Sequence, residues 1–170
     1  MSNSNLSILV IGGAGYIGSH VVLELCDNGY DVTVFDNLSS GYRINVDRRA
    51  VFIKGDIIDS NDLNDVFHKK YDAVFHFAAK KAAGESMMEP DNYATTNISG
   101  TINILNQMVK NNIKNFIFSS TAAVYGIPKY IPMDEDHPVN PINYYGATKL
   151  MIENNLEWFS RLEGLRFAAL

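Results

Sequence analysis

A tyrosine and a lysine stand four residues apart at Tyr145 and Lys149, and their side chains share one face if this segment is helical. A nearby ammonium stabilises a phenolate and lowers the pKa of a tyrosine. A tyrosine tuned in this way can remove the proton of an alcohol or a sugar hydroxyl near neutral pH. Such pairs also occur on ordinary helix surfaces, so the pair alone does not define a catalytic site.

Hydroxyl side chains precede this pair, directly after a segment that is typical of a buried strand. The expected strand covers Asn115 to Ser119, and Ser120 and Thr121 continue the chain. The carboxyl end of a strand in an open parallel sheet lies on the side where ligands bind. Thr121 is therefore a candidate for hydrogen bonding to a reacting oxygen, whereas Ser119 and Ser120 could equally be local turn residues.

Three glycines follow the apolar run from Leu6 to Ile11 at regular spacing, namely Gly12, Gly15 and Gly18. A strand, a turn with these glycines and a helix start together predict a phosphate-binding turn. Gly12 permits the tight turn, Gly15 lets the backbone approach a pyrophosphate, and Gly18 lets the helix pack on the strand. The N–H groups and the dipole at the helix N-terminus also favour phosphate.

Asp36 ends the next apolar run, 18 residues after Gly18. A carboxylate at this position can accept hydrogen bonds from an adenosine ribose and would repel a 2′-phosphate. The sequence therefore favours NAD over NADP, although the nearby cation Arg43 slightly weakens that preference. The alternative is an ordinary glycine-rich turn followed by a surface aspartate.

Further strand ends carry weaker signals. Asp56 could reach an adenine amino group, but a turn or helix-starting role is a fair rival for it. Ala78 and Ala79 are small and suit the close passage of a dinucleotide. We interpret His76 as a core histidine, and the spacing of the four histidines does not indicate a metal site.

The elements that must position these residues alternate between short apolar runs and longer amphipathic stretches, which predicts a doubly wound α/β fold with a parallel sheet. The expected strands are Leu6 to Ile11, Asp31 to Phe35, Ala50 to Lys54, Ala73 to Phe77, Asn115 to Ser119 and a last one from about Leu165. The expected helices are Ser19 to Asn28, Asp62 to Lys70, Pro90 to Asn112 and Pro141 to Arg161.

Length and composition set the class of protein. The chain has 170 residues, 46% of them hydrophobic and 19% charged, with a net charge of −5, which indicates one globular domain rather than a disordered chain or a general nucleic-acid binder. A single cysteine and the lack of a long apolar run favour a cytoplasmic protein without a membrane segment. The chain ends within an expected strand, so we expect the sequence to be truncated.

Four segments make the chain similar to the extended short-chain dehydrogenase/reductase family, and within it to nucleotide-sugar 4-epimerases, over its whole length. These segments are Gly12 to His20, Asp36 to Ser40, Phe77 to Ser86 and Ser119 to Gly126. The resemblance implies a Rossmann-like NAD-binding domain over residues 1–170, with the substrate region of the family absent.

The resemblance also implies roles for individual residues. Tyr145 would be the base, Lys149 its electrostatic partner and Thr121 the catalytic hydroxyl. The cofactor would contact Gly12, Gly15, Tyr16, Ile17, Gly18, Asp36, Asn37, Asp56, Ile57, Phe77, Ala78, Ala79, Lys81, Asn97, Ser119, Tyr145 and Lys149. The substrate would lie near Lys81, Ser86, Thr121, Tyr125 and Tyr145.

The implied reaction interconverts UDP-glucose and UDP-galactose, a step of galactose metabolism, by reversible hydride transfer between sugar C4 and bound NAD. Alanines at positions 122 and 123 argue against the related 4,6-dehydratases, which need a carboxylate there. Another nucleotide-sugar epimerase or oxidoreductase and a non-catalytic NAD-binding remnant remain alternatives. Without the substrate region, we expect this chain alone to have little or no activity.

Two long helices carry apolar residues beyond those needed to cover a sheet, among them Met108, Met151 and Trp158. In the family that the chain resembles, the corresponding helices form a homodimer. We therefore expect a homodimer of the full-length protein, with coverage of the sheet as the alternative role for these residues.

Overall fold

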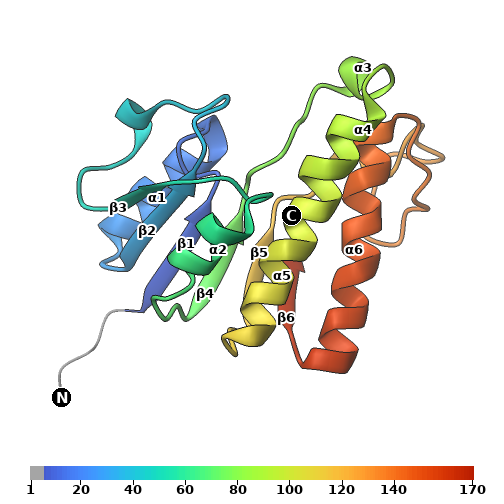
Figure 1. Cartoon of the computed structure of the whole chain (residues 1–170). Helices are drawn as coiled ribbons and strands as arrows, with labels where there is room; N and C mark the ends of the chain where they lie inside the picture. Colours follow the sequence, from blue (N-terminus) through green and yellow to red (C-terminus); the bar gives the residue numbers. More distant parts are fainter. Residues whose placement is uncertain (1–5) are drawn as a thin grey trace.

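The structure is a computed structural model that describes residues 6–170. Six strands form one parallel sheet in the order β3-β2-β1-β4-β5-β6 (Figure 1), which confirms the expected doubly wound α/β fold. The strands are β1 (Ser7–Ile11), β2 (Asp31–Asp36), β3 (Val51–Lys54), β4 (Ala73–His76), β5 (Asn115–Phe118) and β6 (Arg166–Ala169).

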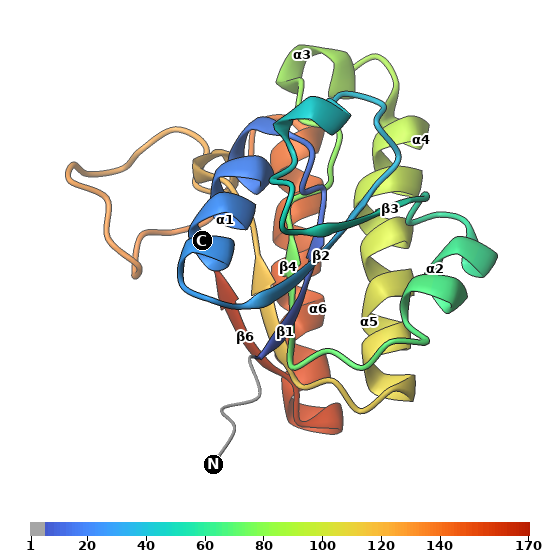
Figure 2. The ribbon, with the colours of Figure 1, turned by 90° about the vertical axis from the view of Figure 1, so that its left-hand side faces the viewer.

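Helices cover the two faces of the sheet unequally. Figure 2 shows α1 on one face and α2, α5 and α6 on the other. The reason is that the chain moves from β1 to β2 in one direction and from β3 through β6 in the other, and right-handed crossovers then use opposite faces. The longer helices are α1 (Tyr16–Asp27), α2 (Ser60–Val66), α5 (Gly100–Lys110) and α6 (Tyr144–Glu163).

Shorter helical segments fill the connections. They are the 3-10 turns η1 (Arg43–Asn45) and η3 (Ala122–Val124), the short helices α3 (Ala83–Ser86) and α4 (Pro90–Tyr93), and the π-helical turn η2 (Ala94–Ser99). The helix expected from Pro90 to Asn112 is therefore α4, η2 and α5 in succession. No helix among residues 6–170 is long and apolar enough to cross a membrane.

The core consists of two apolar clusters, one on each face. Along β1, Ile8 and Val10 belong to the cluster under α1, whereas Leu9 and Ile11 belong to the larger cluster under α2, α5 and α6. This alternation is the two-residue period of a strand that is buried on both sides. It determines which side chains of β1 face each layer of helices, and the glycine turn follows directly at the end of this buried strand.

Two expectations about helices need correction. Helix α6 begins at Tyr144 rather than near Pro141, because Asn143 is its N-cap and accepts a hydrogen bond from the Gly146 amide at 2.8 Å. Met108, which we expected to be surplus on the helix surface, is fully buried in the larger cluster. Met151 and Trp158 are exposed, as expected.

Candidate functional site

The three glycines of the first turn have different surroundings. A Cβ on Gly12, whose φ is +80°, would lie 2.8 Å from the Ala78 Cα, and a Cβ on Gly18 would lie 2.9 Å from the Gly13 Cα. A Cβ on Gly15 would approach nothing closer than the Gly12 carbonyl oxygen at 3.4 Å. The fold itself therefore requires glycine at Gly12 and Gly18, whereas the space beside Gly15 is open to a ligand such as a pyrophosphate.

Asp36 lies at the end of β2 and faces the glycine turn. Its carboxylate accepts hydrogen bonds from the amide of Ala14 at 2.9 Å and from the amide of Leu38 at 2.8 Å. Sequence reasoning did not reveal this structural role. Each carboxylate oxygen can accept a second bond, so Asp36 can still receive ribose hydroxyls. Arg43, the cation expected to weaken a preference for NAD, lies with its guanidinium over the Phe52 ring at 4.7 Å.

A cleft of about 370 Å³ runs along the carboxyl ends of β1, β2 and β4. Most of the residues that we expected to bind a cofactor line it, and they come from five separate segments of the chain. They are Gly12, Gly15, Tyr16, Ile17, Gly18, Asp36, Asn37, Asp56, Ile57, Phe77, Ala78, Ala79, Lys81 and Ser119. The expected residues Asn97, Tyr145 and Lys149 are not among those lining this cleft.

Asp56 combines the two roles that the sequence left open. Its carboxylate accepts hydrogen bonds from the Asn37 side chain at 2.9 Å and from the Ile58 amide at 3.1 Å, so it stabilises the turn after β3. It also lines the cleft. Asp59, rather than Asp56, is the N-cap of α2, because its side chain accepts from the amides of Asn61 and Asp62.

Lys149 lies in the second turn of α6 and is buried, with only 4% of its surface exposed. Its ammonium donates to the Ser119 carbonyl oxygen at 2.8 Å and lies 4.7 Å from the centre of the Phe118 ring. Burial lowers the pKa of Lys149 to about 8, and the negative charge of Glu153 opposes that shift. The lysine is thus fixed at the carboxyl end of β5, beside a residue that lines the cleft.

Tyr145 is the second residue of α6 and lies next to the short helix α3. Its amide donates to the Ser86 hydroxyl at 3.0 Å, and that hydroxyl donates to the Ala83 carbonyl at 2.6 Å. Ser86 is fully buried, so the structure gives this expected substrate residue a positioning role. Thr121, by contrast, uses its hydroxyl to accept from the Ala123 amide at 3.2 Å and is only partly buried.

Asn97 sits in the π-helical turn η2, and its side chain joins two distant segments. The side-chain oxygen accepts from the Lys80 amide, while the side-chain nitrogen donates to the Lys80 carbonyl, both at 2.9 Å. The same nitrogen donates to the Thr148 hydroxyl at 3.1 Å. Asn97 therefore holds the segment that carries Lys81 against α6, which is a structural role that the sequence did not indicate.

His76 is a core residue, as the sequence suggested. The Thr101 hydroxyl donates to the Asn97 carbonyl, so it accepts the hydrogen bond that joins it to the His76 Nε2 at 2.9 Å. The other ring nitrogen, Nδ1, has no hydrogen-bonding partner among the described residues. Burial lowers the pKa of His76 to about 3, with a further contribution from the charge of Lys149.

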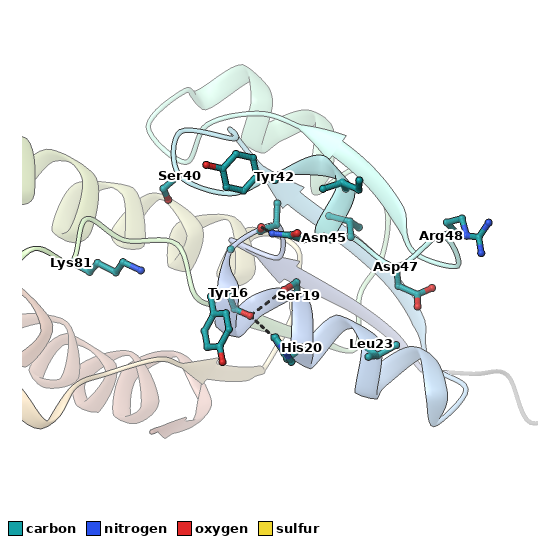
Figure 3. Close-up of a pocket in the computed structure, with 14 residues that line it drawn as sticks. Tyr16, Ser19, His20, Leu23, Ser40, Tyr42, Asn45, Asp47, Arg48 and Lys81 are labelled. Carbon is teal, nitrogen blue, oxygen red and sulfur yellow. Dashed lines mark hydrogen bonds between the residues drawn. The ribbon is translucent and has the colours of Figure 1, made fainter.

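A second, more open hollow of about 660 Å³ lies on the other side of the glycine turn. Figure 3 shows Tyr16 and His20 of α1 on one wall, Tyr42 on the loop after β2, and Lys81 extending towards Tyr16 from a separate segment. The Tyr16 carbonyl accepts bonds from the Ser19 hydroxyl and the His20 ring. Lys81 also lines the cleft, so the two hollows adjoin.

The parallel sheet, its strand order and the glycine turn define the class of Rossmann-type α/β proteins. Within that class, the chain belongs to the NAD-dependent epimerase/dehydratase family, which it matches over residues 8–170.

Individual relatives support the same placement. A UDP-glucose 4-epimerase of Lactobacillus helveticus is 47% identical over 166 residues, covering 97% of this chain and 50% of the relative. The crystal structure of UDP-glucose 4-epimerase from Brucella ovis in complex with NAD is 42% identical, with a TM-score of 0.93, and covers 98% of this chain and 51% of that one.

A third relative is named for a different sugar. The UDP-N-acetylglucosamine 4-epimerase of Methanobrevibacter ruminantium, in complex with UDP-N-acetylmuramic acid, is 37% identical with a TM-score of 0.90. The match covers 97% of this chain and 54% of that one. The chain spans about half the length of the curated relatives it matches.

Proposed function

We propose that this chain is the NAD-binding and catalytic part of a UDP-glucose 4-epimerase, with residues 1–170 as its NAD-binding domain and the cytoplasm as its location. The observation that carries the proposal is the position of Lys149. It is buried, it is bound to the Ser119 carbonyl at the end of β5, and it stands one helical turn after Tyr145. A buried ammonium close to a tyrosine favours the phenolate form, which a tyrosine base needs.

The cleft fits NAD on two independent observations. The open space beside Gly15 would accept the pyrophosphate, with Gly12, Tyr16, Ile17 and Gly18 around it. Asp36, which faces the glycine turn, would receive the adenosine ribose, and Asp56 and Ile57 would lie near the adenine. The repulsion between Asp36 and a 2′-phosphate favours NAD over NADP.

When bound, NAD supplies the acceptor and donor of hydride at sugar C4. The chain's own residues would move the proton. Tyr145 would take the proton of the 4-hydroxyl and later return it, while Lys149 would stabilise the phenolate and hold the nicotinamide ribose. Thr121 would hydrogen-bond the reacting oxygen. Ser119 would line the nicotinamide end of the cleft.

The substrate would be a nucleotide sugar, UDP-glucose or UDP-galactose. Lys81 supports this proposal, because it lines both hollows and could bridge cofactor and substrate. Tyr125 would lie near the sugar. Ser86 would act through Tyr145, since its buried hydroxyl is bound to the Tyr145 amide.

A chimera would test the proposed activity. In it, residues 6–170 replace the matching half of the Lactobacillus helveticus relative, which is 47% identical. We expect the chimera to convert UDP-galactose to UDP-glucose, and Tyr145→Phe to slow turnover roughly 10²–10⁴-fold. Tyr144→Phe is the matched control, because Tyr144 has a threonine and not a lysine four residues on.

Other outcomes would identify the alternatives. A folded chimera that binds NAD but does not turn over would indicate a non-catalytic cofactor module and would sink the proposal. Accumulation of free NADH with substrate would indicate an oxidoreductase with net redox, because an epimerase recycles its cofactor. If the chimera converts only a UDP-N-acetylhexosamine, the substrate is that nucleotide sugar and not UDP-glucose or UDP-galactose.

We further propose that the protein forms a homodimer through α6. Met151, Trp158 and Leu162 are exposed along this helix at spacings of seven and four residues, which places them on one side of it. Sedimentation of wild type and of Trp158→Glu tests the assignment. We expect a dimer for the wild type and a monomer for the variant, and a wild-type monomer would refute it.

A further inference from the structure

Helix α6 carries a third polar residue in line with the tyrosine and the lysine. Tyr145, Lys149 and Glu153 follow one another at four-residue intervals, so their side chains rise along one face of the helix. Glu153 is only partly exposed although it is charged. A carboxylate that turns towards the protein interior rather than towards water needs a partner.

Ser120 is that partner. Its hydroxyl donates a hydrogen bond to a carboxylate oxygen of Glu153, and its amide donates to the Leu170 carbonyl at 2.8 Å. Ser120 lies between Ser119, whose carbonyl receives the Lys149 ammonium, and Thr121. Glu153 and Lys149 therefore fasten the strand end after β5 to the same face of α6 at two neighbouring residues.

Glu153 also acts on Lys149 electrostatically. No ion pair within 4.0 Å joins the two side chains in the described part of the chain, so the carboxylate acts on the ammonium through its charge and not through a direct contact. Its charge raises the pKa of Lys149 against the opposing effect of burial. The other titratable groups facing this pair are His76 on β4 and Tyr125 after η3, besides Tyr145 on α6 itself.

None of these neighbours can replace the carboxylate. His76 has a pKa of about 3, so it is neutral at working pH, and burial, followed by the charges of Glu135 and Glu153, raises the pKa of Tyr125. We propose that Glu153 is a positioning residue of the site, which fixes the strand end beside Thr121 and supplies the counter-charge of Lys149. Its part in the reaction rests on the proposed function, whereas its effect on Lys149 does not.

The size of the effect follows from the pKa of Lys149, which is about 8. At pH 8, Lys149 carries its charge in about half of the molecules. Loss of a nearby opposite charge lowers the pKa of a lysine by about 1, which would reduce the charged fraction at pH 8 to about one tenth. Fewer molecules would then hold the charge that stabilises the phenolate form of Tyr145.

A direct test is a carbon NMR titration of the lysine Cε signals in this 170-residue chain without cofactor. The Lys149 signal is assigned as the one that Lys149→Arg removes. We expect Glu153→Gln, which still accepts the Ser120 hydroxyl, to lower the Lys149 pKa by about 1. Glu157→Gln is the matched control, because Glu157 lies one turn further along and pairs with Arg161.

An equal Lys149 pKa in wild type and Glu153→Gln would overturn the proposal, since a purely structural role predicts that result. If Glu153→Gln does not fold, the carbon NMR titration of Glu153 in the wild-type chain tests the proposal instead. The Glu153 Cδ signal must then show a second inflection at the pKa of Lys149, and its absence would overturn the proposal equally.

The chimera separates this inference from the proposed function. We expect Glu153→Gln to shift the pH dependence of turnover, and Glu157→Gln to leave it in place. An inactive chimera refutes the proposed epimerase, while the NMR titration still decides the action of Glu153 on Lys149.

Discussion

Gly15 and Gly18 belong to the same turn, yet alanine should act differently at each. At Gly18, a Cβ would press on the Gly12 and Gly13 backbone, so we expect Gly18→Ala to destabilise the fold by about 1–3 kcal/mol. At Gly15, where φ is −75°, alanine fits and the free energy of unfolding should stay within about 0.5 kcal/mol of wild type.

The affinity for NAD should be reduced more by Gly15→Ala than by Gly18→Ala. The reason is that the new Cβ of Gly15→Ala would occupy the space proposed for the pyrophosphate. Urea unfolding gives the stabilities, and calorimetric titration with NAD gives the affinities. Gly15→Ala binding NAD as tightly as wild type would contradict the assignment of this space.

His76 should make the protein sensitive to acid. Its pKa is about 3 in the folded state, against an ordinary value of 6.5. Between these values the unfolded chain binds the proton and the folded chain does not, so stability falls as pH falls from 6.5 towards 3. At pH 4.5 the loss from this residue is about 2–3 kcal/mol, and above pH 6.5 it vanishes.

Urea unfolding at pH 7 and pH 4.5 measures this loss. We expect His76→Gln to reduce the difference between the two pH values, whereas His68→Gln, at an exposed histidine, should leave it unchanged. An identical acid loss in His76→Gln and wild type would refute the assignment to His76.

The sequence predicted that most of the proposed cofactor residues would come together, and they line one cleft. The spacing of Gly12, Gly15 and Gly18 was informative because the fold itself requires glycine at Gly12 and Gly18, whereas Gly15 leaves space open beside the turn. The sequence did not identify Glu153, because a glutamate on a helix is normally expected to face solvent. The partner that draws it inward, Ser120, is 33 residues away in the sequence.

The π-helical turn η2 contains Asn97, whose side chain binds the backbone of Lys80. We expect Asn97→Ala to destabilise the fold by roughly 2–4 kcal/mol, because the Lys80 amide and carbonyl would lose their partner. Thr148→Val, which removes one hydroxyl from the same network, should cost less. Urea unfolding measures the loss of stability in both variants. An equal loss would show that the two hydrogen bonds between Asn97 and the Lys80 backbone contribute little.

The six strands and the longer helices were predictable from the sequence, whereas the short helical segments and some boundaries were not. The start of α6 depends on the Asn143 cap, which competes in the sequence with a proline two residues earlier that is also typical of a helix start. The π-helical turn could not be foreseen, because local propensity does not indicate it and the partners of its Asn97 side chain are residues 80 and 148, far away in the sequence.

At the scale of the whole molecule, the two faces of the sheet are covered unequally. Phe75, Ile117 and Ala168 stand in register on β4, β5 and β6, on the side opposite α5 and α6. All three are partly exposed, although Phe75 packs against the apolar cluster under α1, the helix that lies on this face in Figure 2. The sequence could not show this, because an apolar strand has the same pattern whether or not its face is covered.

The cleft, in contrast, joins both halves of the sheet, so a cofactor bound there should stabilise the molecule as a whole. Its walls come from the turns after β1, β2 and β3 and from the segment after β4. A ligand that binds only the folded state at 100 times its Kd adds about 2.7 kcal/mol. For a chain of this size we expect NAD to raise the Tm by about 5–10 °C under those conditions.

Differential scanning calorimetry with NAD, NADP and the Gly15→Ala variant tests this expectation. NADP should raise the Tm less than NAD at equal concentration, because the Asp36 carboxylate, which already holds the Ala14 and Leu38 amides, would face the 2′-phosphate. Gly15→Ala should show little rise with either nucleotide. Equal shifts for NAD and NADP would remove Asp36 from the ribose site, and no shift with NAD in the wild type would refute the cofactor assignment itself.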